Sequence, residues 1–219
     1  MGALRAVDLP GEQVDVEQNT AQEEEVQAKG IVVHPSKLKL PVAATSRVAP
    51  GEDDPAVWLV GAHGGAGVST LAHVLAPAGD AGMMWPSGER SMCCVLVCRS
   101  TAMGLEDAHD VLIQARNGLA GDVVVLGLVV VADAPGRTPK TLEQKIAVLS
   151  QITQKVWRVP YIDQWRGEMR EDLPVWVPGD ELPRKRRGRL PPGVVPPVVG
   201  EIGQEIFTSF QRVMRKVRM

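Results

Sequence analysis

The sequence predicts an α/β fold in which a mostly parallel sheet lies between two layers of helices. Short apolar runs without a polar face alternate with longer segments whose apolar residues recur at helical spacing. Turns rich in glycine or containing proline separate the two kinds of segment. Because this alternation favours right-handed crossovers, we expect parallel strands with helices covering both faces of the sheet.

Each predicted element follows from its local pattern. Apolar runs predict buried strands at residues 56–62, 92–98, 123–132 and 156–162. Apolar residues at intervals of three and four predict helices at residues 68–76, 104–119 and 138–154, and a terminal helix at residues 200–219. We expect Thr138 to be an N-cap, with Pro139 at the first helical position. Residues 77–91 are expected to form an irregular connection.

Charge divides the chain into three parts. The formal net charge is −2 overall, but it is −5 over residues 1–56, −4 over residues 57–183 and +7 over residues 184–219. We predict a disordered or loosely attached acidic arm at residues 1–54 and an α/β domain at residues 55–183. Residues 184–219 are predicted to be a basic linker and an amphipathic helix packed on the domain. No run approaches the roughly 20 apolar residues of a membrane span, so we expect a cytoplasmic protein.

A glycine-rich turn joins the first predicted strand to the first predicted helix. It reads LVGAHGGAGVSTLA over residues 59–72, with Gly61 and Gly67 flanking its centre. Such turns present backbone N–H groups to an anion, as in phosphate loops of the pattern G-x-x-x-x-G-K-[ST]. Here Val68 stands in place of the lysine, and Ser69 stands where a hydroxyl would bind Mg²⁺. The alternative is that the glycines serve packing alone.

The turn and the segments after it resemble the MinD/ParA family of P-loop proteins. Residues 63–70, HGGAGVST, resemble its deviant Walker A loop, K-G-G-V-G-K-[ST]-T. VLVCRSTAMGLEDAHDVL, VVVLGLVVVADAPG and VWRVPYIDQW resemble three later parts of that family, so the resemblance covers roughly residues 56–168. It implies a three-layer P-loop fold in a degenerate bacterial branch, with a site for ATP or ADP and Mg²⁺. The implied cofactor-binding residues are Gly61, His63, Gly64, Gly65, Ala66, Gly67, Val68, Ser69, Thr70 and Asp133, with Ser69 as the metal ligand.

The departures from the family bear on catalysis. Its two loop lysines correspond here to His63 and Val68, and Asp80 is the only aspartate in the connection where a Walker B strand would end. Removing one electrostatic contact to a transition state typically costs about 10²- to 10³-fold in rate. Because several such contacts are missing, we do not expect ATP hydrolysis and assign no catalytic residue.

Several side chains have two interpretations. A protonated His63 would replace a lysine, whereas a neutral His63 would be hydrogen-bonded within the loop. Asp133 and Arg137 follow the third strand, where open sheets bind ligands, but Asp133 also suits a turn. The residues expected to pack in the core are Cys93, Cys94, Cys98, Trp157, Trp165 and Trp176.

The basic end of the chain also has two interpretations. An apolar stripe with Arg212, Arg215 and Lys216 in the last turns resembles the helix by which MinD-type proteins bind membranes. Packing of that stripe on the sheet is the alternative. Residues 184–189, RKRRGR, are either an exposed linker or a contact for nucleic acid.

We therefore predict a degenerate, non-hydrolysing MinD/ParA-like protein that regulates or scaffolds partitioning, positioning or mobile-element maintenance. This role is implied by the resemblance alone. The alternatives are an active ATPase with an unusual loop, and a peripheral membrane or DNA adaptor that acts through the basic tail. The predicted partner is an unidentified protein or a second copy of the chain. Residues 184–219 are the predicted contact for nucleic acid or for anionic lipid at the inner face of the membrane.

Overall fold

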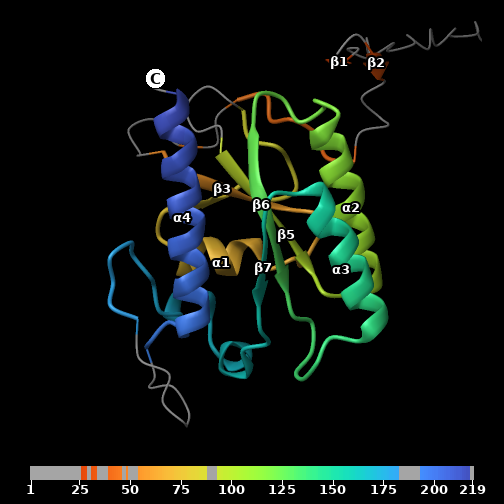
Figure 1. Ribbon diagram of the computed structural model, residues 1–219. Coiled ribbons are helices and arrows are strands. Elements are labelled where there is room, and N and C mark those ends of the chain that lie inside the picture. Colours follow the sequence, from red (N-terminus) through yellow and green to blue (C-terminus); the bar gives the residue numbers. More distant parts are fainter. Residues whose placement is uncertain are drawn as a thin grey trace, which may run out of the picture.

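A computed structural model describes residues 26–28, 31–33, 39–45, 48, 54–87, 93–182 and 193–217 of the 219-residue chain. Its centre is a five-stranded sheet whose strands are all parallel (Figure 1). The strands are β3 (Val57–Gly61), β4 (Ala78–Asp80), β5 (Cys93–Arg99), β6 (Val124–Val131) and β7 (Val156–Val159), in the order β4-β3-β5-β6-β7. This arrangement confirms the predicted α/β fold.

Helices cover both faces of the sheet. The helices α1 (Val68–Val74) and α4 (Pro197–Val217) lie on one face, and α2 (Ala102–Arg116) and α3 (Lys140–Ile152) lie on the other (Figure 1). Because strand side chains alternate between faces, Cys93 packs in the core under α1 and α4, while Cys94 and Cys98 pack under α2 and α3. All three cysteines are buried, as the sequence predicted.

Two local predictions are wrong. The connection at residues 77–91 is not wholly irregular, because Ala78–Asp80 pairs in parallel with Val57–Leu59. This strand contains no β-branched residue, so no local signal marks it, and Gly79 is needed because a Cβ would lie 2.8 Å from the ring of Trp58. Thr138 is not the N-cap of α3, since that helix starts at Lys140 after Pro139 and no side chain caps it.

Parts of the predicted acidic arm have defined structure. The strands β1 (Val26–Ala28) and β2 (Ile31–Val33) form an antiparallel pair. Lys39 and Leu40 lie against α2, and the side chain of Leu40 is only 1% exposed. Most of the arm, and the basic run at residues 184–189, lie outside the described residues.

The C-terminal helix α4 uses its apolar stripe against the domain. Val199, Ile202 and Ile206 are buried in the core under α1. Its last turns are more exposed, and Val217 is 58% exposed. Among the helices in the described part of the chain, none is long and apolar enough to cross a bilayer.

Candidate functional site

The strand order places a ligand crevice at one end of the sheet. Numbered along the chain, the five strands run 2-1-3-4-5, so the connection after β3 leads to one side of the sheet and the connection after β5 leads to the other. Open α/β sheets bind ligands outside the carboxyl ends of the strands at this switch point. The loop after β3, residues 62–67, lies there, as do Arg99 at the end of β5 and the two residues that follow it.

Two glycines give the loop its shape. Gly65 has φ 74° and Gly67 has φ 101°, both in the left-handed region that strains other residues. Gly67 directly precedes α1, whose first residue is Val68. The N–H of Gly61 donates to the carbonyl of Gly82 at 2.7 Å, which ties the start of the loop to the turn after β4.

His63 links the loop to β5. Its Nε2 lies 3.1 Å from the backbone nitrogen of Arg99, and its Nδ1 lies 2.9 Å from the carbonyl oxygen of Gly64. A backbone N–H can only donate and a carbonyl can only accept, so Nε2 accepts and Nδ1 carries the proton. This pattern fits only the neutral imidazole, which is the hydrogen-bonded interpretation of His63 rather than the cationic one.

The guanidinium of Arg99 is fixed beside the loop. Its Nε donates to the carbonyl of Gly65 at 3.2 Å, and one terminal nitrogen donates to the carbonyl of Ala132 at 3.2 Å. Arg99 therefore bridges the glycine-rich loop and the end of β6. Two of its five N–H groups are used in these bonds, which leaves donors for an anion.

The loop surrounds a hollow of about 360 Å³. Gly61, all residues from His63 to Thr70, Asp80 and Arg99 line it. A second hollow of about 210 Å³ lies alongside and is lined in part by Tyr161, Ile162 and Trp165. The two share Gly67, Thr70 and Arg99, so the loop hollow and a partly aromatic one meet at the same three residues.

The structure brings together most of the predicted site residues, but not all. Nine of the ten line the loop hollow, whereas Asp133 is exposed and lines neither of these two hollows. Its backbone N–H donates to the hydroxyl of Ser100 at 3.0 Å, which joins the segment after β6 to the segment after β5. Val68, in the lysine position, is only 8% exposed and packs in the apolar core.

Sequence reasoning missed the role of two residues. Arg99 was not singled out, and Asp80 was placed in an irregular connection. Each is the last residue of its strand, and strand ends meet at the ligand side of a parallel sheet. For Arg99, its position after a predicted strand was a usable signal. Gly61 lies six residues before Gly67 instead of five, so Ala62 takes the first glycine position of the phosphate-loop pattern.

The cysteines are unsuited to metal binding or nucleophilic chemistry. Burial raises the pKa of Cys98 to about 12, so this thiol stays protonated at neutral pH. Within the described ranges, no group of three or more His, Cys, Asp or Glu side chains is placed to hold a metal ion.

The fold and the crevice define a class: an open parallel α/β domain with a glycine-rich loop at its switch point. The chain belongs to a family of unknown function, DUF6668, whose model matches residues 55–177. That span contains the five strands, the loop and both hollows, while Leu40 and α4 lie outside it. No curated protein and no solved structure matches the chain.

Proposed function

We propose that this protein is a degenerate MinD/ParA-like P-loop protein that binds a nucleotide at the loop hollow without hydrolysing it. The observation that carries the proposal is the junction of the two hollows at Gly67, Thr70 and Arg99. One hollow is lined by the glycine-rich loop and by the guanidinium of Arg99, a combination that suits phosphate groups. The other offers Tyr161 and Trp165 to a flat, partly apolar group such as a base.

Arg99 supplies the positive charge that the loop lacks. In a phosphate loop, a lysine neutralises the β- and γ-phosphates, and Val68 has no charge. The guanidinium of Arg99 lies against the same loop and lines both hollows. Because a guanidinium presents a fixed fork of donors, it suits phosphate oxygens. A cation from the neighbouring strand thus replaces the cation of the loop.

The missing hydrolysis follows from what the hollow lacks. His63 is neutral and uses both ring nitrogens within the protein, so it cannot replace the signature lysine. We infer that the protein is a regulatory or scaffolding factor in partitioning, positioning or mobile-element maintenance. In this role, bound nucleotide would set the functional state of the protein without being hydrolysed.

An active ATPase is the second candidate. Ser69 and Asp80 both line the loop hollow, and Asp80 ends the strand next to β3. A hydroxyl and a carboxylate are oxygen ligands that Mg²⁺ accepts. In this case Mg²⁺ would strengthen ATP binding, and phosphate release would be measurable.

Titration calorimetry with ATP, ADP and pyrophosphate, with and without Mg²⁺, tests both candidates. We expect ATP binding that Gly67→Ala weakens, since the left-handed backbone at residue 67 strains any other residue. Gly179→Ala is the matched control, because Gly179 has φ 100° and lies outside both hollows. Absence of nucleotide binding by the wild-type protein would overturn the proposal, and Mg²⁺-dependent turnover would establish the second candidate instead.

A further inference from the structure

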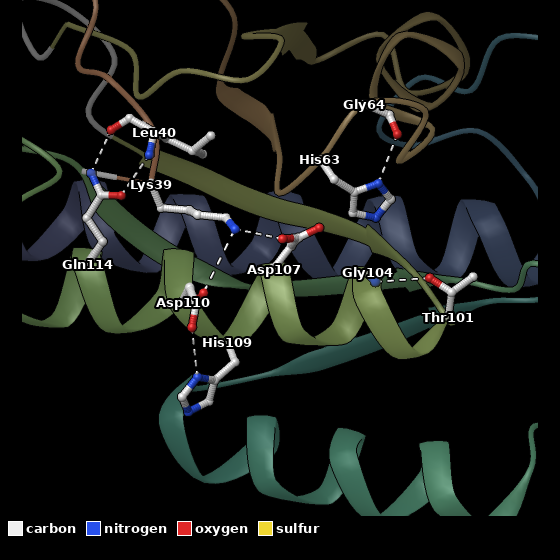
Figure 2. Close-up of polar contacts among 10 residues, drawn as sticks. All are labelled: Lys39, Leu40, His63, Gly64, Thr101, Gly104, Asp107, His109, Asp110 and Gln114. Carbon is white, nitrogen blue, oxygen red and sulfur yellow. Dashed lines mark hydrogen bonds and ion pairs between the residues drawn. The ribbon is translucent and has the colours of Figure 1, made fainter. Parts of the chain in front are cut away.

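Residues 39–43 cross from α2 to the turn after β4, and we refer to them as the strap. Figure 2 shows Lys39 and Leu40 lying over α2, with side chains of that helix pointing toward them. The strap precedes the family match, which begins at residue 55. It is therefore an addition to the part of the chain that carries the loop.

Polar and apolar contacts hold the strap on α2. The amide of Gln114 bonds both ways to Leu40: its Oε1 accepts from the backbone N–H at 2.9 Å, and its Nε2 donates to the carbonyl at 2.6 Å. Gln114 is the one buried polar side chain among the described residues. Lys39 forms an ion pair with Asp107 at 2.8 Å, and the side chain of Leu40 lies in the core.

The other end of the strap holds the turn after β4. The N–H of Ala43 donates to the carbonyl of Trp85 at 2.8 Å, and the N–H of Trp85 donates to the carbonyl of Pro41 at 2.9 Å. Val42 and Trp85 thus form a parallel bridge. The indole of Trp85 is fully buried in the same core as Leu40, so the strap and this turn are packed as one unit.

That turn is also a wall of the loop hollow. Gly82 accepts from the N–H of Gly61 at 2.7 Å, and its own N–H donates to Asp80 Oδ1 at 2.7 Å. Asp80, Gly82 and Met83 all line the hollow. The strap is therefore bonded to Trp85 through Pro41 and Ala43, the backbone leads from Trp85 back to Gly82, and Gly82 is bonded to Gly61 at the end of β3.

We propose that the strap is a positioning device for the loop hollow: when it is attached, it fixes the turn at residues 81–85, and its release loosens the site. The inference rests on the proposed function only where ligand affinity is concerned. By linkage, a ligand that binds the ordered hollow also favours the attached strap. Release of the strap, by competition for its position on α2 or by removal of its charge, then lowers ligand affinity.

Amide hydrogen exchange in the full chain tests the coupling without any ligand. Leu40→Ser should speed exchange at Gly61 and Gly82 by about 5- to 150-fold, the usual range of coupling between sites. Neither amide touches the strap, so a purely local effect of the substitution would leave them unchanged. Ile202→Ala, a buried substitution in α4 on the opposite face, is the control for general loss of stability.

A second pair of variants avoids the core. Lys39→Glu should speed exchange at the same two amides. Adding Asp107→Lys should restore the slower exchange of the wild type, because the ion pair then forms with its charges reversed. Lys145→Glu, which breaks the ion pair between Lys145 and Glu106 of α2, is the matched control. Unchanged exchange at Gly61 and Gly82 in both strap variants would overturn the inference.

A ligand arm separates this inference from the proposed function. If ATP binds the wild type, it should slow exchange of the Trp85 amide, and Lys39→Glu should weaken ATP binding. If ATP does not bind, the proposed function fails, but the exchange result without ligand still decides whether the strap positions the turn.

Discussion

The sheet carries a hollow at each end, and the two hollows differ in how their charged groups are held. At the amino ends of β6 and β7, a groove of about 400 Å³ runs beside α4 and contains Lys155, Arg212 and Lys216. At the carboxyl ends, the loop hollow is slightly smaller and contains Arg99. Cations therefore occur at both ends, but their surroundings differ.

In the amino-end groove, the polar groups are already used or are free to move. Lys155 pairs with Glu205 at 2.5 Å, and the hydroxyls of Thr208 and Ser209 donate to carbonyls of the preceding helical turn. Arg212 and Lys216 are exposed side chains on one helix. Arg99, in contrast, is held by carbonyls from two different elements. A site thus depends on donors that are fixed before the ligand arrives, not on volume.

The largest expected effect is on stability and arises at the amino end. The indole of Trp157 is 4% exposed and covers Gly127, whose Cβ, if present, would lie 2.5 Å from the ring. Trp157→Ala should cost about 3–5 kcal/mol in the free energy of unfolding, measured with urea. ATP affinity of the folded variant should be unchanged. A tenfold loss of affinity in folded protein would show that the two ends are not separate.

The next effect is on ligand binding at the carboxyl end. Arg99→Ala should weaken ATP binding by about 10- to 100-fold, because a hydrogen bond to a charged group contributes about 1.5–3 kcal/mol. Arg99→Lys should recover only part, since an ammonium cannot span Gly65 and Ala132 as the guanidinium does. In calorimetry, the Arg212→Ala and Lys216→Ala variants should change the affinity less than twofold. Equal losses of ATP affinity from the substitutions at the two ends of the sheet would refute the difference between the two hollows.

The same contrast explains what the sequence could and could not predict. The strands β3, β5, β6 and β7 and the glycine-rich loop can be predicted from patterns within a few residues, namely unbroken apolar runs and consecutive glycines. The strand β4 was missed because Ala78–Asp80 becomes a strand only by pairing with β3. Leu40 was assigned to an arm because its contacts with Gln114 span 74 positions in the sequence.

The site residues divide in the same way. The loop residues are consecutive, so their meeting at one hollow needed no knowledge of the tertiary fold. Arg99 reaches that hollow only because β5 lies beside β3 with its carboxyl end at the same edge. Asp133 also follows a strand, but it lies one strand further away, after β6, and its backbone N–H donates to the hydroxyl of Ser100.

A smaller effect concerns the histidine of the loop. Nε2 of His63 accepts from the N–H of Arg99 and Nδ1 donates to the carbonyl of Gly64, so the ring joins the loop to β5. His63→Phe, which removes both bonds, should speed amide exchange at Arg99 by about tenfold, because a hydrogen bond contributes about 0.5–1.5 kcal/mol. Nitrogen-15 shifts of the wild-type ring should show the Nδ1–H tautomer. His109→Phe, at an exposed histidine on α2, is the control. A wild-type ring that carries its proton on Nε2 would contradict this assignment.

The smallest effect lies at the other end of the sheet, in the ion pair of the groove. Hydrogen bonds from Lys155 and then from Trp157 hold the pKa of Glu205 below its usual value. The stabilisation is therefore present above the unfolded pKa of about 4.3 and is lost as pH falls through the lower folded pKa. Glu205 is half exposed, so Glu205→Gln should cost at most about 1 kcal/mol at pH 7.

Urea unfolding at several pH values checks the sign of this effect. The difference between wild type and Glu205→Gln should shrink as pH falls below the unfolded pKa of about 4.3, and it should vanish once pH lies below the lowered pKa of the folded protein, where the wild-type carboxyl is also neutral. ATP affinity should not follow the change, since Lys155 and Glu205 lie at the amino ends of the strands. A stability difference that does not change with pH would mean that packing, rather than the charge of Glu205, holds this end of α4.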